Sequence, residues 1–174
     1  METQSIVVLD FGAQYSQLIA RRIREQNVFS VVLPCTATLD EIRSYSPLGI
    51  ILSGGPCSVY DQDAPNTDRR VFDLGLPVLG LCYGLQLMVH VLGGKVKAAD
   101  KREYGHAEVE IKHDSRLFHD IPKKLSVWMS HGDEAVDLPA GFHLTASSPN
   151  AVAAIENPNK KLFAVQFHPE VRHT

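Results

Sequence analysis

Cys82 stands between two glycines in the pattern Gly80-Leu-Cys-Tyr-Gly84. The apolar residues 77–81 predict a buried strand, and residues 83–92 predict a helix that ends at two glycines. A strand that turns abruptly into a helix around such a residue is the cysteine counterpart of the nucleophile elbow. The alternative is a small apolar core cysteine between two packing glycines, which is the usual role of a lone buried cysteine; here, however, the strand, the cysteine, the helix and both glycines coincide. We therefore predict that Cys82 is a nucleophile, its thiolate stabilised by the helix N-terminus, and that the Tyr83 N–H faces the oxyanion.

A thiol nucleophile needs a base, and the base needs an orienting acceptor. His168-Pro-Glu170 supplies both within one tripeptide. Proline disfavours a helical conformation at the residue before it, and residues two apart in an extended chain lie on one side. We therefore expect Glu170 to accept a hydrogen bond from the far ring nitrogen of His168, although a His-Pro pair alone is also typical of a surface turn.

A Gly-rich loop, Ser53-Gly54-Gly55-Pro56, follows the apolar residues 48–52. It lacks the Lys-Ser/Thr pair of a phosphate-binding P-loop. Two glycines opposite Cys82 fit better as a second oxyanion donor, because no side chain keeps their N–H groups away. A plain turn is the alternative interpretation.

The first half of the chain alternates predicted strands with predicted helices, which favours right-handed crossovers and a parallel sheet. The strands are residues 5–9, 29–33, 48–52 and 77–81, and the helices are residues 14–27, 38–45, 65–74 and 83–92. The second half consists of short strands with turn-rich links, at residues 95–98, 106–112, 125–129, 142–147, 151–156 and 162–167. The predicted fold is a flavodoxin-like, doubly wound α/β fold. It has a mostly parallel central sheet with helices on both faces and added antiparallel strands in the second half.

Ligands of doubly wound sheets gather outside the carboxyl ends of the strands. Three predicted strands run into the motifs above: residues 48–52 lead to the Gly-rich loop, residues 77–81 to Cys82, and residues 162–167 to His168. We expect these three ends to converge on one rim.

Composition excludes several classes of function. The length of 174 residues fits one domain, and a net charge of −3 offers no electrostatic case for binding nucleic acid or a membrane. The start of the chain lacks the pattern of a signal peptide, and three unpaired cysteines favour a reducing compartment, so we expect a cytoplasmic protein. No His or Cys pair has zinc-ligand spacing, and we predict no metal site. Cys35 and Cys57 have no predicted role.

With these motifs in hand, the chain resembles the class I (triad) glutamine amidotransferases, from about residue 6 to residue 170. Among them it is most similar to the glutaminase domains of GMP synthetases, through residues 9–17, 53–60, 102–105 and 128–133.

The resemblance implies roles for individual residues. Cys82 would be the nucleophile, His168 the base and acid, and Glu170 its orienting group. Gly55 and Tyr83 would form the oxyanion hole through their backbone N–H groups. The glutamine would be held by a set of pocket residues: Gly54, Gln86, Ser130, His131 and Gly132.

The resemblance also implies partners. Glutamine would be the substrate, and the ammonia would pass to an ATP-pyrophosphatase domain, fused or separate, that aminates xanthosine monophosphate to GMP. No cofactor is expected in this domain, whereas ATP and Mg²⁺ would bind to the partner. We expect residues 1–174 to form a single glutaminase domain without the family's last segment and without the ATP-pyrophosphatase domain.

Other interpretations stay open on sequence grounds. The same thiol chemistry serves anthranilate synthesis and carbamoyl phosphate synthesis, and also γ-glutamyl hydrolases. A non-catalytic binding domain is disfavoured because Cys82, His168 and Glu170 are all present.

Residues 130–133 are expected to lie on a loop that could carry a partner's signal, with Asp133 either a contact or a solvated turn residue.

Overall fold

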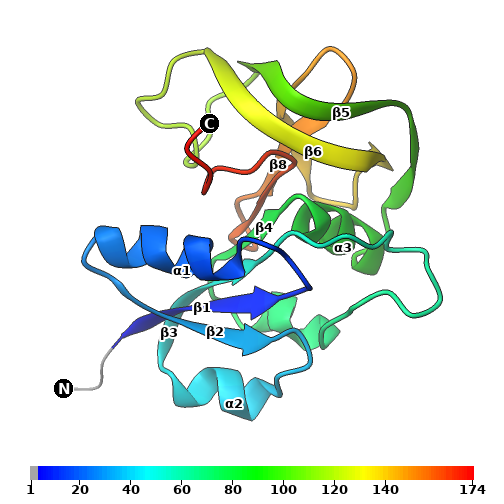
Figure 1. Ribbon diagram of the computed structural model, residues 1–174. Coiled ribbons are helices and arrows are strands. Elements are labelled where there is room, and N and C mark those ends of the chain that lie inside the picture. The colour runs from blue at the N-terminus through cyan, green and yellow to red at the C-terminus, as the bar shows by residue number, and fades with distance from the viewer. Residues whose placement is uncertain (1–3) are drawn as a thin grey trace.

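The computed structural model describes residues 4–174, whose strands form one nine-stranded sheet in the order β2-β1-β3-β4-β9-β8-β7-β5-β6 (Figure 1). The strands are β1 (Ser5–Asp10), β2 (Phe29–Pro34), β3 (Pro47–Leu52), β4 (Val78–Leu81), β5 (Lys95–Ile111), β6 (Lys124–Asp137), β7 (His143–Ser147), β8 (Val152–Asn157) and β9 (Leu162–Val165). The helices are α1 (Ser16–Glu25), α2 (Leu39–Ser44), the short 3₁₀ helix η1 (Arg69–Asp73) and α3 (Tyr83–Val91).

The first half of the sheet is parallel. β1 pairs with β2 and β3, β3 with β4, and β4 with β9, all in parallel. The order 2-1-3-4 followed by one further parallel strand is that of the flavodoxin-like doubly wound fold. The predicted fold class is therefore confirmed, with β9 as the fifth parallel strand.

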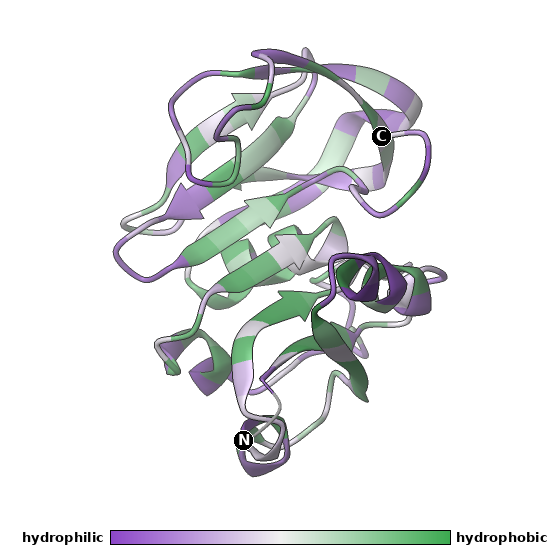
Figure 2. Cartoon of the chain, turned by 90° about the vertical axis from the view of Figure 1, so that its left-hand side faces the viewer, coloured by the Kyte–Doolittle hydropathy of each residue, from purple (hydrophilic) through white to green (hydrophobic). Residues whose placement is uncertain are grey.

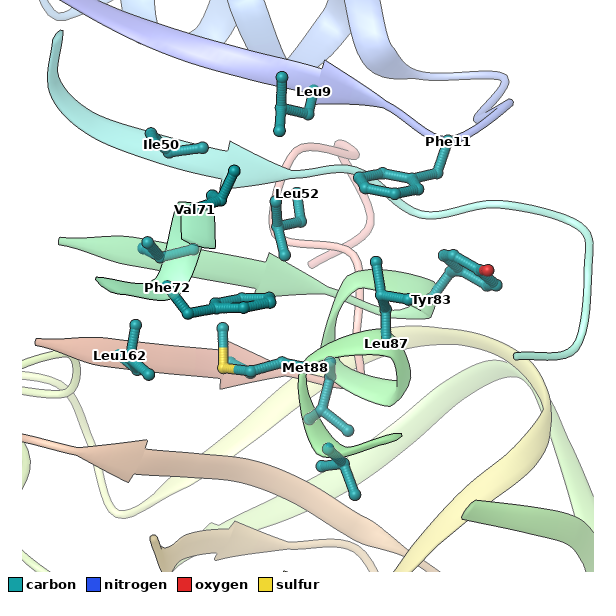
Figure 3. Packing of buried hydrophobic residues seen from close by; sticks show 14 of the residues in the cluster. Leu9, Phe11, Ile50, Leu52, Val71, Phe72, Tyr83, Leu87, Met88 and Leu162 are labelled. Atoms are coloured by element: carbon teal, nitrogen blue, oxygen red, sulfur yellow. The ribbon is translucent and has the colours of Figure 1, made fainter. Parts of the chain in front are cut away.

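Successive side chains of a strand point to opposite sides, so the apolar strands of this parallel part present hydrophobic side chains on both faces. Helices cover both of these faces. Val7, Leu9 and Leu52 pack in one cluster with side chains of α2, η1 and α3, as Figure 3 shows for Leu9, Leu52, Phe72 and Met88. Val8, on the other face, packs in a second cluster with Ile19 of α1. Figure 2 shows the central strands as mostly hydrophobic and the outer loops as largely hydrophilic.

The second half of the sheet is antiparallel. β8 pairs with β9 and β7, and β7 with β5. β5 and β6 form a long hairpin whose register shifts between Ala98 and Glu103. The strands predicted at residues 95–98 and 106–112 are therefore both parts of β5.

Two local predictions were wrong. Residues 65–74 do not form an α-helix; only η1 is helical, because the Asn66 side chain bonds to the backbone before η1 and Asp68 caps the N-terminus of η1. Asn66 Oδ1 accepts from the Thr67 N–H, and Asp68 Oδ1 accepts from the Arg70 N–H. Residues 130–133 do not lie on a loop, because β6 continues through them in pairing with β5.

Candidate functional site

Cys82 occupies a strained turn between β4 and α3. Its backbone has φ 51° and ψ −105°, a conformation that L-residues rarely adopt. The flanking glycines allow the chain to pass closely at two points. A Cβ at Gly80 would lie 2.6 Å from the Gly84 carbonyl oxygen, and a Cβ at Gly84 would lie 2.6 Å from the Leu52 carbonyl oxygen. The spacing of the two glycines is thus a steric requirement of this elbow.

His168 and Glu170 follow β9 and face the elbow. His168 Nδ1 lies 2.8 Å from Glu170 Oε1, and both residues are buried. The His168 N–H donates to the Trp128 carbonyl of β6 (3.0 Å), and the Thr174 hydroxyl donates to the His168 carbonyl (2.7 Å). The imidazole is therefore fixed by its own backbone and by Glu170, with Nε2 left for Cys82.

The electrostatic setting of His168 favours the charged ring. Burial of the ring lowers the pKa of His168, but hydrogen bonds to the Cys82 sulfur and the Glu170 carboxylate outweigh it and raise the pKa to about 10. A protonated imidazole between a sulfur and a carboxylate can donate a hydrogen bond to each of them.

The Gly-rich loop after β3 lies against the same residues. A Cβ at Gly54 would lie 3.2 Å from His168 Cε1 and 3.7 Å from Cys82 Cβ, so Gly54 sits beside both. The Ser53 hydroxyl is fully buried; it accepts from the Phe11 N–H (2.9 Å) and donates to the Gly54 carbonyl (2.8 Å). These bonds fix the backbone that leads to Gly55.

A pocket of about 330 Å³ opens over Cys82. Its walls come from the Gly-rich loop, the elbow and the β5–β6 hairpin, at Gly55, Pro56, Cys57, Ser58, Cys82, Gln86, Arg102, Tyr104, Ser130, His131, Gly132 and Asp133. Five residues predicted from the sequence alongside Cys82 line this pocket: Gly55, Gln86, Ser130, His131 and Gly132. Gly54 and Tyr83 are placed next to it, Gly54 between Cys82 and His168 and Tyr83 at the first position of α3.

The Tyr83 side chain points away from the pocket. Figure 3 shows its ring beside that of Phe11. The two ring centroids are 5.7 Å apart, and the Tyr83 hydroxyl donates to the Pro65 carbonyl. Only the backbone of Tyr83 is available to a substrate, and the first N–H groups of a helix have no acceptor within that helix.

Several polar residues of the site had no firm role assigned from the sequence. Asp133 is buried, and its carboxylate accepts from the Ser58 hydroxyl (2.5 Å) and the Tyr60 hydroxyl (2.7 Å), which ties the Gly-rich segment to β6. A solvated turn aspartate is thus excluded. Gln166 Nε2 donates to the Cys82 sulfur at 3.6 Å, and Glu103 bonds to His131.

Three further features concern the cysteines, metal binding and membrane-spanning helices. All three cysteines are free thiols, and Cys57 shares the pocket with Cys82. Within residues 4–174 no group of three His, Cys, Asp or Glu side chains could hold a metal ion. No helix in the same part of the chain is long and apolar enough to span a membrane.

Comparison with known proteins identifies relatives. The family model described as "Glutamine amidotransferase class-I" matches residues 7–174. The GMP synthase (glutamine-hydrolyzing) of Brachyspira hyodysenteriae is 54% identical over 170 residues, and that of Geobacillus kaustophilus is 55% identical over 175 residues. These matches cover 97% and 100% of this chain but only 33% and 34% of the relatives, so the chain spans about a third of their length.

Solved structures agree with these relatives. A protein from Thermoplasma acidophilum, described as a putative GMP synthase subunit, superposes with a TM-score of 0.85 at 30% identity, over 100% of this chain and 88% of that one. A glutamine amidotransferase from Thermotoga maritima superposes with a TM-score of 0.80 at 23% identity, over 98% of this chain and 77% of that one. The second likeness supports the fold alone.

Proposed function

This chain belongs to the class I glutamine amidotransferases, and from that membership we propose that it hydrolyses glutamine through a thioester on Cys82 and supplies ammonia for GMP synthesis. Residues 1–174 act as one glutaminase domain. The observation that carries the proposal is the strained Cys82 elbow, which lines the pocket and faces a buried His168–Glu170 pair.

The first half-reaction forms the thioester. The Cys82 thiolate attacks the side-chain amide carbon of glutamine, and the N–H groups of Gly55 and Tyr83 stabilise the resulting oxyanion. The C–N bond then breaks, and His168 gives its proton to the departing nitrogen, which leaves as ammonia. Glu170 keeps the imidazole oriented and stabilises its positive charge.

The second half-reaction releases glutamate. Water attacks the thioester carbon while His168 takes one of its protons. The new tetrahedral intermediate expels the Cys82 thiolate, and His168 is again protonated for the next cycle. Gly54, Gln86 and residues 130–132 hold the amino-acid part of the substrate, which is consistent with their position at or beside the pocket.

The acceptor of the ammonia is an ATP-pyrophosphatase domain that uses ATP and Mg²⁺ to activate xanthosine monophosphate. Support comes from the relatives, which are named as glutamine-hydrolysing GMP synthases and are about three times as long as this chain. The names favour this assignment over anthranilate or carbamoyl phosphate synthesis and over γ-glutamyl hydrolysis.

The test is labelling by an electrophilic glutamine analogue, 6-diazo-5-oxo-norleucine, followed by peptide mass mapping. We expect label on Cys82, and none on Cys57 or Cys35. Cys57 is an internal control because it lines the same pocket but does not stand at the start of a helix. A reagent that merely fills the pocket would modify both thiols, and that result would overturn the assignment of the nucleophile.

A second measurement tests turnover. Cys82→Ala should abolish glutamate release from glutamine, whereas Cys57→Ala should retain it, because only Cys82 forms the thioester. Glutamate release that survives Cys82→Ala would refute the proposed mechanism.

A further inference from the structure

A buried carboxylate lies one layer behind the pocket. Glu103 of β5 pairs across the hairpin with His131 of β6. Glu103 Oε2 lies 2.9 Å from His131 Nε2, and the exposed fractions of the two side chains are 8% and 1%. Burying such a pair costs solvation free energy and adds little to stability, so its retention calls for another explanation.

Hydrogen bonds at both ring nitrogens fix the orientation of the His131 imidazole. His131 Nδ1 lies 2.9 Å from the Asp133 carbonyl oxygen. A carbonyl only accepts, so Nδ1 carries a hydrogen, and a proton must also lie between Nε2 and Glu103. The second oxygen of Glu103 accepts from the Ser148 hydroxyl (2.9 Å) and from Asn150 Nδ2 (3.1 Å). The carboxylate is thus held by the segment that follows β7, and the carboxylate in turn holds the imidazole of His131.

The network continues from His131 to the reacting sulfur. The Asp133 carbonyl that His131 bonds also accepts from Gln86 Nε2 at 3.1 Å. Gln86 Nε2 lies 3.4 Å from Gln166 Oε1, and Gln166 Nε2 donates to Cys82 Sγ. His131, Asp133 and Gln86 all line the pocket, whereas Glu103 does not.

We propose that Glu103 is a positioning residue for glutamine binding: through His131 it fixes the Asp133 carbonyl, and with it the Gln86 amide and the β6 wall of the pocket. The inference rests on the proposed function, because it assigns this wall to glutamine. Its prediction is specific. Loss of Glu103 weakens the binding of glutamine more than it slows the chemistry at Cys82.

Three variants separate this role from ordinary stability. Glu103→Ala leaves the His131 ring without one partner. Glu103→Gln can keep every bond, since its amide N–H donates to neutral His131 Nε2 while its oxygen accepts from Ser148 and Asn150. Glu156→Ala is the matched control, because Glu156 is also buried and accepts from Ser115 and His143 but lies outside the pocket.

The readout is the rate of Cys82 alkylation by 6-diazo-5-oxo-norleucine against reagent concentration. We expect Glu103→Ala to raise the half-saturating concentration by roughly 10- to 100-fold, the range for a buried polar group left unpaired. The saturated rate should change much less. Glu103→Gln and Glu156→Ala should keep the wild-type half-saturating concentration.

Two further arms keep the test decisive. If Glu103→Ala does not fold, Ser148→Ala removes one donor to Glu103 from outside the pocket and should raise the half-saturating concentration in the same direction. Iodoacetamide, which needs no glutamine pocket, should alkylate wild type and variant at the same rate.

The proposal is overturned if Glu103→Ala, or Ser148→Ala in its place, has the same half-saturating concentration as Glu156→Ala. It is also overturned if Glu103→Gln raises this concentration as much as Glu103→Ala does, or if alkylation of the variant by iodoacetamide is slowed as much as alkylation by the glutamine analogue. Failure of the proposed function gives a different result. Wild-type Cys82 would then show no saturable reaction with the glutamine analogue at all.

Discussion

At the scale of the residue, the proposed chemistry depends most on the protonation state of His168. The raised pKa of about 10 means that the ring keeps its proton through the neutral range. Because folding raises the pKa of His168, protonation of the ring stabilises the folded state. This stabilisation is fully present below about pH 6.5, the ordinary pKa of histidine, and is lost as the pH rises through about 10. A protonated His168 can give its proton to the departing nitrogen of the substrate, which then leaves as ammonia.

Glu170→Gln tests this electrostatic account. Glutamine at position 170 can still accept from His168 Nδ1 but carries no charge, so we expect the pKa of His168 to fall by about 1 to 3. The alkaline limb of the Cys82 alkylation profile should move to lower pH by that amount. Glu156→Gln, which alters a buried glutamate bonded to His143, is the control and should leave the profile in place. An unmoved alkaline limb in Glu170→Gln would show that the carboxylate charge does not support the imidazolium.

At the scale of the element, the turn from β4 to α3 is the part that its local sequence determines most strictly. A methyl group at Gly84 would meet the Leu52 carbonyl oxygen at 2.6 Å and Leu52 Cβ at 2.9 Å, both on the neighbouring strand β3. Backbone inside a sheet cannot move aside as a flexible side chain can. The glycine pattern therefore predicted this element correctly from sequence alone.

Gly84→Ala should destabilise the fold by about 1 to 3 kcal/mol through overpacking. Gly132→Ala is the matched control, since its methyl group would lie no closer than 3.5 Å to the Arg102 and Tyr104 side chains, an ordinary contact. Chemical denaturation of the two variants measures the difference. Equal midpoints for Gly84→Ala and wild type would mean that β3 and α3 can separate at no cost, contrary to the close packing described here.

Not every element could be predicted in this way. Apolar runs such as those of β1 and β4 indicated buried strands, and the motifs indicated the Cys82, His168 and Gly-rich segments. The Glu103–His131 bond joins residues 28 apart, and it depends on the register of β5 against β6, which no local pattern determines. Residues 130–133 were expected on a loop, but their pairing with β5 in the same hairpin makes them part of β6.

At the scale of the whole molecule, the site joins the two halves of the chain. β3, β4 and β9 are neighbours in the sheet, so their carboxyl ends bring Gly54, Cys82 and His168 together, as expected. The opposite wall comes from the antiparallel half, through β5 and β6. The Asp133 carboxylate connects these parts, because it holds Ser58 and Tyr60 of the segment that also carries Gly55.

This connection offers a physical basis for the hypothesis that the proposed partner domain controls glutamine hydrolysis. A glutaminase that ran freely would release ammonia without an acceptor. Losing one oxyanion donor costs about 10² to 10³ in turnover, so a small displacement of the Gly55 N–H is enough to keep the site nearly silent. Glycine can change its backbone conformation at little steric cost, so Gly55, which follows the part of the loop that Ser53 holds, is the position suited to move.

We therefore expect the isolated chain to react with 6-diazo-5-oxo-norleucine yet hydrolyse glutamine slowly, and to speed up by about 10² or more when an ATP-pyrophosphatase domain loaded with ATP and xanthosine monophosphate completes the oxyanion hole. Glutamate release is measured with the partner absent, present but empty, and loaded. Cys82→Ala with the loaded partner gives the background.

Tyr60→Phe, which removes one of the two hydroxyl groups bound to Asp133, should raise the slow rate or lower the activated one, because the loop is then held less firmly. Full turnover by the isolated chain, unchanged by the loaded partner and by Tyr60→Phe, would rule out control through this loop.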